Sequence, residues 1–278
     1  MDFDFSDLET TGFVILKNVI NSEEINRLLA DYIETKSKTN FVFSSKTDKE
    51  TGLPISSLKS TITDLVAQIN SKTSLKPDWV YPSGVYLNNN LINLMWHQDH
   101  EIFYKTQDAF NTLNFWLPII KPKRNQDGLK VIPHDVLRNQ FPEIAEDWIL
   151  NKGAKLFQAK DNKTIIFDHD AGTELIVDDD LFALSKEIDI GVGDILIHRC
   201  DLVHGSATKV NSRLAISVRS INSKSIFNKS KFLNNCSFKE DIIKKNPLSY
   251  ETIMKKIAEE PNRESFTLNE LYSLGVEN

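Results

Sequence analysis

Cysteine is nearly absent from this chain of 278 residues, which contains only Cys200 and Cys236. Two cysteines cannot build a disulfide framework or a thiolate zinc site, so we expect a reducing compartment. No apolar run approaches the roughly 18 residues that a membrane-spanning helix needs. The acidic N-terminus also lacks the basic and apolar regions of a signal peptide. These absences predict a cytoplasmic protein without a membrane partner.

A concentrated basic charge is also lacking, because the chain is mildly acidic, with 33 Lys and Arg against 39 Asp and Glu and a net charge of −6. Nucleic acids and anionic membranes bind to concentrated basic surfaces, so we expect no nucleic-acid partner. A hydrophobic content of 40% with 26% charged residues is typical of a globular protein. We expect a small molecule as the partner, and no pattern indicates an oligomeric state.

Short apolar segments rich in β-branched residues recur from residue 80 onward and predict strands. The predicted strands are Val80–Leu87, Leu91–His97, Thr112–Ile119, Thr164–Phe167, Asp194–His198, Asp201–Ser206 and Leu214–Ile221. Asn88 to Asn90 is a candidate hairpin turn, because Asn tolerates the left-handed backbone conformation. Many short strands at regular spacing favour a sandwich or barrel over a βαβ sheet.

The two ends of the chain show helical spacing of apolar residues. The predicted elements there are a strand at Gly12–Ile20, a helix with Ser22 as its N-cap, and helices at Ser57–Asn70, Tyr250–Glu259 and Leu268–Leu274. We therefore expect a mainly β protein with helical additions, forming a single domain over residues 1–278. Its β core would span about residues 80–222, with a strand and helices over 1–79 and a helical extension over 239–278.

Four of the six histidines fall in two short segments, Trp96-His-Gln-Asp-His100 and His198-Arg-Cys-Asp-Leu-Val-His204. Residues two apart on a strand point to the same side, so His97 and Asp99 can face one point in space. A second strand can add His204 as a third ligand. Two imidazoles and one carboxylate with open positions suit non-heme Fe(II). On the triplet alone, a hydrogen-bonded structural histidine remains an alternative for His97.

Arg213 lies nine positions after His204, across a predicted hairpin, and can point into the same cavity of a barrel. A guanidinium there would bind a ligand carboxylate with two hydrogen bonds. A surface salt bridge is the alternative for this arginine. Arg219 is the competitor on the same strand face and ranks second because it lies farther along the strand.

Three segments together resemble the phytanoyl-CoA dioxygenase family of Fe(II)/2-oxoglutarate oxygenases. They are Trp-His-Gln-Asp at 96–99, Gly-Asp-Ile-Leu-Ile-His-Arg-Cys-Asp-Leu-Val-His-Gly-Ser at 193–206, and Asn-Ser-Arg-Leu-Ala-Ile-Ser at 211–217. The opening segment from Gly12, the Asn-Phe-Trp-Leu-Pro segment from Asn114 and the segment from Asp127 to His134 add to the resemblance. It runs in family order from about residue 11 to 221.

The resemblance implies a double-stranded β-helix, a cupin-like jelly roll, with the metal inside one open end. By motif position the iron ligands would be His97, Asp99 and His204, and Arg213 would bind the distal carboxylate of 2-oxoglutarate. The remaining residues implied at the cosubstrate are Ser206 as a hydrogen-bond donor, Trp116 near it, and Asn114 on the same strand face as Trp116.

The resemblance also implies a dioxygenase that consumes 2-oxoglutarate and O2 and releases succinate and CO2, with hydroxylation of a small molecule as the default outcome. Asp99 disfavours halogenation, because related halogenases lack this carboxylate. The alternatives are desaturation or ring closure by the same chemistry, a non-catalytic ligand-binding jelly roll, and a cupin-type hydrolase or isomerase that uses another metal.

Two departures from the family limit what can be transferred about the substrate. The segment between His204 and Arg213 is slightly short, and the usual Pro-Gly-Ser-His signature is reduced to Pro133-His134. We expect His134 on a surface loop and not as a fourth ligand. We also expect Cys200 to pack within a strand, and the Lys-rich stretch from Lys224 to Lys245 to be a solvated surface.

Overall fold

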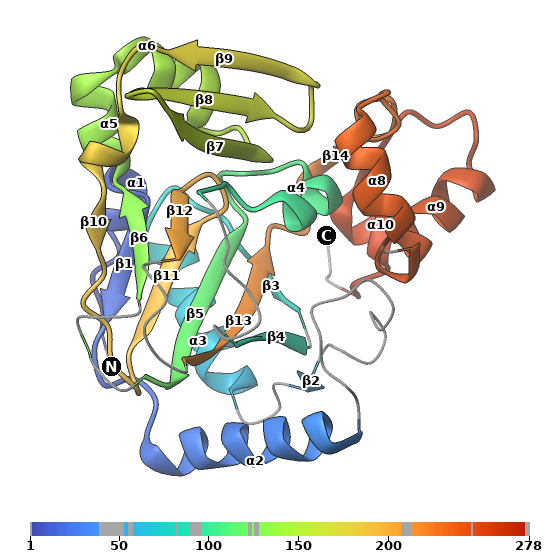
Figure 1. Cartoon of the computed structure of the whole chain (residues 1–278). Helices are drawn as coiled ribbons and strands as arrows, with labels where there is room; N and C mark the ends of the chain where they lie inside the picture. The colour runs from blue at the N-terminus through green and yellow to red at the C-terminus, as the bar shows by residue number, and fades with distance from the viewer. Residues whose placement is uncertain are drawn as a thin grey trace.

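The main sheet of this computed structural model contains seven strands, all paired antiparallel. The structure describes residues 2–38, 53–54, 58–81, 83–88, 96–121, 124, 128–206, 213–245 and 247–275. The strand order is β1 (Phe13–Leu16), β11 (Ile195–Arg199), β5 (Leu113–Ile120), β13 (Leu214–Ile221), β4 (Ser83–Asn88) and β2 (Leu53–Pro54), with β3 (Trp79–Val80) pairing with β13. Figure 1 shows these strands in the centre of the molecule.

A second layer consists of two three-stranded sheets. One has the order β10 (Lys186–Glu187), β6 (Leu129–Ile132) and β12 (Val203–Ser206), and the other has the order β7 (Lys155–Lys160), β8 (Lys163–Asp168) and β9 (Thr173–Val177). His97 forms single β-bridges with Leu156 of β7 and with His204 of β12. The backbone at His97 therefore joins the two three-stranded sheets into one layer.

Residues of both layers meet in one buried apolar cluster. Trp116 and Leu196 from the main sheet lie in this cluster with Leu129 and Val131 of β6. Two antiparallel layers that enclose a shared interior form a double-stranded β-helix. The predicted fold class, a mainly β jelly roll with helices toward both ends, is confirmed.

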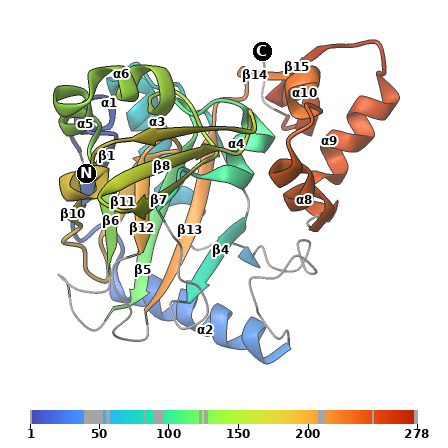
Figure 2. The same ribbon diagram turned by 45° about the horizontal axis from the view of Figure 1, so that its top comes forward.

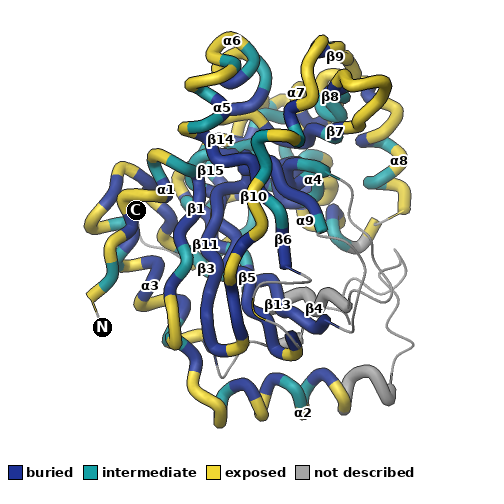
Figure 3. Tube along the Cα trace, turned by 60° about the vertical axis from the view of Figure 1, so that its left-hand side comes forward, coloured by how far each residue is buried: buried dark blue, intermediate teal, exposed yellow. Residues whose placement is uncertain are grey.

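The alternation of side chains along β5 separates two environments. Leu113, Phe115 and Leu117 belong to the cluster under the outer helices, whereas Trp116 belongs to the interior cluster between the layers. Asn114 has the same parity as Trp116, so it also faces the interior. Figure 3 shows β5, β11 and β13 of the main sheet buried along most of their length. The polar side chain of Asn114 is thus directed into the space between the two layers.

Helices cover the other face of the main sheet. They are α1 (Asp7–Thr10), α2 (Ser22–Lys38) and α3 (Lys59–Lys72), and their apolar residues share one cluster with β5, β11 and β13. The prediction of Ser22 as the N-cap of α2 was wrong by one residue. Asn21 Oδ1 accepts a hydrogen bond from Glu24 N at 2.9 Å, because an Asn carboxamide caps as well as a hydroxyl does. No helix within the described ranges is long and apolar enough to cross a membrane.

The predicted strands Thr112–Ile119 and Leu214–Ile221 are confirmed as β5 and β13, and Val80–Leu87 corresponds to β3 and β4. Residues 91–95 of another predicted strand, and Asn89 and Asn90 of the predicted turn, lie outside the described residues. Sequence periodicity missed several short elements. They are β6, β7, β9, α4 (His100–Thr106), α5 (His134–Gln140), α6 (Pro142–Ile144), the π-helical turn at Ala145–Ile149 and the 3₁₀ turn at Leu181–Leu184.

The C-terminal extension groups at one side of the molecule, next to α4 (Figures 1 and 2). Its elements are β14 (Ile226–Asn228), α7 (Lys229–Phe232), α8 (Ser237–Lys245), α9 (Pro247–Glu259), β15 (Ser265–Thr267) and α10 (Leu268–Tyr272). The predicted helices at 250–259 and 268–274 correspond to α9 and α10. Phe103 and Tyr104 of α4 share an apolar cluster with Tyr250 and Phe266, so the extension packs against α4.

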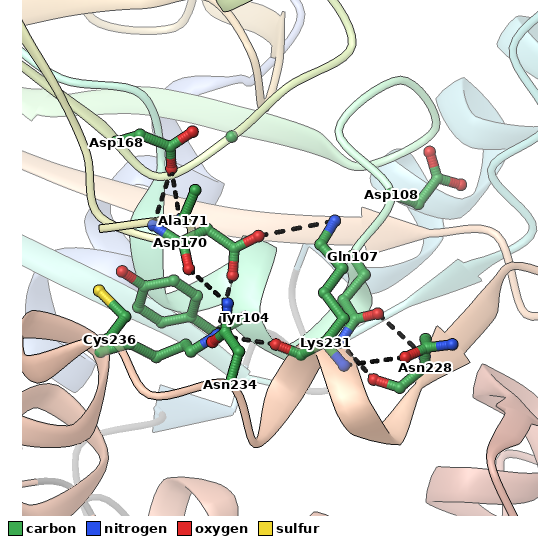
Figure 4. A network of polar contacts seen from close by, with 12 residues as sticks. Tyr104, Gln107, Asp108, Asp168, Asp170, Ala171, Asn228, Lys231, Asn234 and Cys236 are labelled. Atoms are coloured by element: carbon green, nitrogen blue, oxygen red, sulfur yellow. Dashed lines mark hydrogen bonds and ion pairs between the residues drawn. The ribbon is translucent and has the colours of Figure 1, made fainter. Parts of the chain in front are cut away.

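A buried lysine ties this extension to the jelly roll. Lys239 lies in the stretch that was expected to be solvated, but only 1% of its surface is exposed, so that expectation was wrong at this position. Its Nζ donates to Asp170 Oδ1 at 3.0 Å and to the Lys231 carbonyl at 2.8 Å, and it also contacts Asn234 Oδ1. Figure 4 shows Asp170, Lys231 and Asn234 close to one another in this network of polar contacts. Lys239 therefore joins α8 to the turn after β8 through a partly buried carboxylate.

Replacing Lys239 by Met is expected to lower the free energy of unfolding by about 1.5–3 kcal/mol, the range for hydrogen bonds to charged groups. The variant leaves Asp170 facing an apolar chain of similar length. Urea denaturation would measure the loss, with Lys244→Met as the matched control. Lys244 lies on the same helix with 73% of its side chain exposed. Equal stability of the two variants would contradict the assignment of Lys239 as an anchor.

Candidate metal centre

His97, Asp99 and His204 come together at the junction of the two three-stranded sheets. His97 N donates to the His204 carbonyl at 2.8 Å, and His204 N donates to the His97 carbonyl at 3.0 Å. This pair of backbone hydrogen bonds brings the side chains of residues more than 100 positions apart to one point. One ligand atom from each of the three residues lies within 4.8 Å of the other two.

One carboxylate oxygen lies equally close to both imidazoles. Asp99 Oδ1 is 4.0 Å from His97 Nε2 and 3.9 Å from His204 Nε2. Asp99 occupies the N-cap position of α4, yet its side chain makes no capping hydrogen bond. The other oxygen, Oδ2, lies 3.1 Å from Arg219 Nη2. The carboxylate is therefore directed at the imidazoles and at a guanidinium instead of at the helix.

Electrostatics keep this carboxylate ionised. Burial by itself would raise the pKa of Asp99, but Arg219 and then the nearby imidazoles hold this pKa well below its usual range. The ionised form is the one that binds a metal ion. Asp99 can thus serve as an anionic ligand at neutral pH.

His204, one of the two candidate imidazole ligands, is neutral at pH 7. Burial lowers the pKa of His204 to about 4, and it lowers the pKa of the adjacent His198 to about 4 as well. The Leu202 carbonyl lies 2.9 Å from His204 Nδ1. A carbonyl can only accept, so this hydrogen bond assigns the proton to Nδ1 and leaves the lone pair on Nε2, facing Asp99. Neutral imidazole with this tautomer is the metal-binding form.

A second polar group lies where β6 begins. Arg213 is 3% exposed, and its Nη1 donates to the Gly128 carbonyl at 2.7 Å. Its guanidinium carbon lies 5.3 Å from the centre of the Trp116 ring. Ser206 is paired in register with Leu129, the neighbour of Gly128. Arg213, Ser206 and Trp116 therefore gather at the same end of the interior.

Two donors at this end have no hydrogen-bond partner among the described residues. The Ser206 hydroxyl and the Trp116 indole N–H are buried, and neither has a hydrogen-bond partner in the part of the chain that the structure describes. Buried polar groups are nearly always hydrogen-bonded. Such donors beside a guanidinium fit a polar, anionic ligand.

Asn114 and Arg219, the two remaining candidates for the cosubstrate, take part in other contacts. Asn114 Nδ2 lies 2.8 Å from His198 Nε2, and its Oδ1 accepts from Ser217 Oγ at 2.7 Å. Arg219 lies beside Asp99 and is six residues after Arg213, which directly precedes β13. The sequence assigned no role to His198 or Ser217. For Ser217 a signal was available, because it lies two residues before Arg219 and therefore on the same face of the predicted strand.

His134 is fully buried, so its expected place on a surface loop was wrong. Its ring occupies the space beside Gly12, whose positive φ of 86° leaves room that a Cβ would fill. His134 Nε2 lies 3.7 Å from Asp201 Oδ1, and burial lowers the pKa of His134 to about 4. The short Pro-His signature gave no indication of this long-range packing. His134 is not part of the metal-ligand group.

Cys200 lies in a turn directly after β11 and is buried, so the expectation of packing holds although the residue is outside the strand. Its carbonyl accepts a hydrogen bond from Asp99 N at 3.2 Å. Its side chain is directed at the Asp99 carbonyl, with Sγ at 3.5 Å. The turn thereby supports the backbone of a candidate ligand.

The C-terminal extension reaches the neighbourhood of these residues. The Phe238 ring of α8 stacks on His169 with 3.5 Å between ring centres. His169 Nδ1 in turn lies 3.0 Å from Nε2 of His100, the residue that follows Asp99. The extension thus contacts the surroundings of the candidate metal ligands.

Comparison with known proteins identifies a family that matches most of this chain. Residues 8–215 match the family described as phytanoyl-CoA dioxygenase (PhyH). No curated protein sequence matches the chain. The segment from 216 to the C-terminus lies beyond the matched residues.

Several solved structures resemble the chain. The non-heme α-ketoglutarate-dependent carbocyclase SnoK from nogalamycin biosynthesis has 15% sequence identity and a TM-score of 0.50, covering 79% of this chain and 83% of SnoK. The epimerase SnoN from the same biosynthesis has 12% identity and a TM-score of 0.48, covering 80% and 82%. HygX from Streptomyces hygroscopicus, with nickel and 2-oxoglutarate bound, has 13% identity and a TM-score of 0.46, covering 78% and 85%. The likeness to SnoK shows a shared fold.

Proposed function

Because this chain belongs to the phytanoyl-CoA dioxygenase family, we propose that it is an Fe(II)- and 2-oxoglutarate-dependent oxygenase that hydroxylates a small molecule. In this proposal His97, Asp99 and His204 bind Fe(II), and Arg213 binds the distal carboxylate of 2-oxoglutarate. O2 is the second cosubstrate, and succinate and CO2 are the co-products.

The observation that carries the proposal is the convergence of two imidazoles and one ionised carboxylate, with one ligand atom from each within 4.8 Å of the others. Two histidines and one carboxylate leave coordination positions open, which is the ligand set of non-heme Fe(II) oxygenases. His204 presents Nε2 because its Nδ1 is occupied by the Leu202 carbonyl. The donor set of this chain thus fits Fe(II).

The far end of the interior fits the cosubstrate. A guanidinium binds a carboxylate through two parallel hydrogen bonds, and Arg213 is buried where this pairing is strong. Ser206 Oγ and Trp116 Nε1 supply two further donors that the described protein residues do not use. These three groups would hold the distal carboxylate, and Asn114 would support the site through His198.

When bound, Fe(II) and 2-oxoglutarate supply oxidative decarboxylation by O2, which yields an oxidant able to remove hydrogen from a C–H bond. The protein's own residues place and shield these reactants. Asp99 and the two imidazoles orient them at one end, and Arg213 neutralises the carboxylate at the other. Leu129, Val131 and Leu196 exclude water from the interior between the layers.

A cupin-type hydrolase or isomerase would use the same three ligands but would need no buried cation at the far end. Arg213 and its two neighbouring donors therefore favour the oxygenase over that alternative. Ring closure and desaturation use the same cosubstrates as hydroxylation, and product mass separates hydroxylation from the other two outcomes. Hydroxylation adds one oxygen atom, whereas both other outcomes remove two hydrogen atoms.

An anaerobic titration tests the proposal on the wild-type protein. Adding Fe(II) and 2-oxoglutarate is expected to give the weak visible charge-transfer band of the iron–2-oxoglutarate chelate. A protein that produces no band and binds no 2-oxoglutarate would overturn the proposal. A screen of small molecules that reports succinate release, followed by mass spectrometry of the products, would then identify the substrate class.

A further inference from the structure

The two oxygens of the Asp99 carboxylate face different partners. Oδ1 lies 4.0 and 3.9 Å from the two candidate imidazole ligands, whereas Oδ2 lies 3.1 Å from Arg219 Nη2. Asp99 is buried, and its carboxylate provides no cap for α4. Arg219 is thus placed to decide which oxygen is directed at a metal ion.

Arg219 is itself held by a neighbour on its own strand. Its Nη1 donates to Ser217 Oγ, and Ser217 Oγ donates to Asn114 Oδ1 at 2.7 Å. The register of β13 against β5 places Arg219 opposite Asn114 and Ser217 opposite Trp116. The guanidinium therefore extends from a fixed point on two paired strands in the interior of the jelly roll.

The chain of hydrogen bonds continues to a buried histidine. Asn114 Nδ2 donates to His198 Nε2 at 2.8 Å, and His198 Nδ1 donates to the Arg199 carbonyl at 3.0 Å. The hydrogen bonds therefore run in one direction, from Arg219 to Ser217, then to Asn114, and then to His198. The guanidinium at the start only donates. The Arg199 carbonyl can only accept, so the proton of the His198 ring lies on Nδ1 and Nε2 is the acceptor. These linked hydrogen bonds between buried groups fix the position of Arg219 beside Asp99, which it contacts as an ion pair.

We infer that Arg219 is a positioning residue that makes Asp99 a one-oxygen metal ligand. By holding Oδ2, it leaves Oδ1 alone to face the metal, so that Asp99 takes a single coordination position and the remaining ones stay open for 2-oxoglutarate and O2. The inference rests on the proposed function, since it presumes that the three candidate ligands bind Fe(II). Arg219 acts through Asp99, and Arg213 takes the carboxylate of the cosubstrate.

Metal binding by Arg219→Met tests this assignment without turnover. Co(II) serves as the probe, with affinity from calorimetry and coordination from its visible spectrum. We expect Co(II) affinity to fall about 10- to 100-fold, the usual cost of losing a partner that orients a ligand, and the spectrum to change shape. With metal saturating, affinity for 2-oxoglutarate should stay within a few-fold of wild type. Arg213→Met is the matched control, with Co(II) affinity unchanged and 2-oxoglutarate binding weakened.

A second variant, Ser217→Ala, removes the anchor of Arg219 while keeping both charges. We expect a severalfold loss of Co(II) affinity in the same direction, so the test stands even if Arg219→Met does not fold. Unchanged or tighter Co(II) binding in the soluble variants would overturn the inference, because the guanidinium would then act only as a charge that opposes the metal. Loss of 2-oxoglutarate binding alone would also overturn it. If the wild-type protein binds no metal, the proposed function fails instead.

Discussion

Replacing His97 by alanine is expected to lower Fe(II) affinity more than about 100-fold and to abolish 2-oxoglutarate turnover. Loss of a partner that merely orients a ligand costs about 10- to 100-fold in affinity, and the loss of a ligand itself exceeds this. The remaining pair, Asp99 and His204, would offer a cation only two protein atoms. Anaerobic titration with Fe(II), followed by the charge-transfer band with 2-oxoglutarate, would measure the effect.

The fold should survive this substitution, because His97 joins the sheets through its backbone. The hydrogen bonds to His204 use only the N–H and C=O of residue 97. His169→Ala is the matched control, since His169 contacts His100 and Phe238 but no candidate ligand. The control should keep its metal affinity. An undiminished band in the His97 variant would exclude His97 from the metal site.

Replacing Arg213 by alanine is expected to raise the dissociation constant of 2-oxoglutarate about 30-fold or more. Removing one partner of a buried charge pair costs about 2–5 kcal/mol, and each 1.4 kcal/mol is a factor of ten in affinity. The cost is large because the carboxylate would be left without its cation in a dry interior, with only neutral donors such as Ser206 nearby. Calorimetry with metal saturating would measure the change.

The controls for Arg213→Ala separate cosubstrate binding from folding. Metal affinity should be unchanged, since Arg213 lies at the opposite end of β13 from Arg219. Arg213→Lys should recover part of the affinity, because it restores the charge without the two-armed geometry. Equal 2-oxoglutarate affinity in the wild type and both variants would remove Arg213 from the cosubstrate site. Arg219, the next cation on the same face, would then be the candidate.

The sequence could predict those parts of the candidate site that depend on the spacing of nearby residues. His97 and Asp99 are two residues apart, and β5 and β13 are long runs with a period of two. Both features follow from the geometry of an extended chain, so they could be read without the fold. The order of the motifs gave the family and with it the jelly roll. Short elements such as β6, β7 and α4 carry too few residues for a period to be recognised.

What the sequence by itself determined is therefore the set of groups that can bind metal and carboxylate. The tertiary structure decided how those groups are paired, because pairing depends on strand register and on packing between residues far apart in the chain. Register places Arg219 opposite Asn114 and within 3.1 Å of Asp99, although its spacing alone made it a rival of Arg213. Packing buries His134 beside Gly12 and Lys239 beside Asp170. Neither contact has a local signal, since each arises only when distant segments close around one interior.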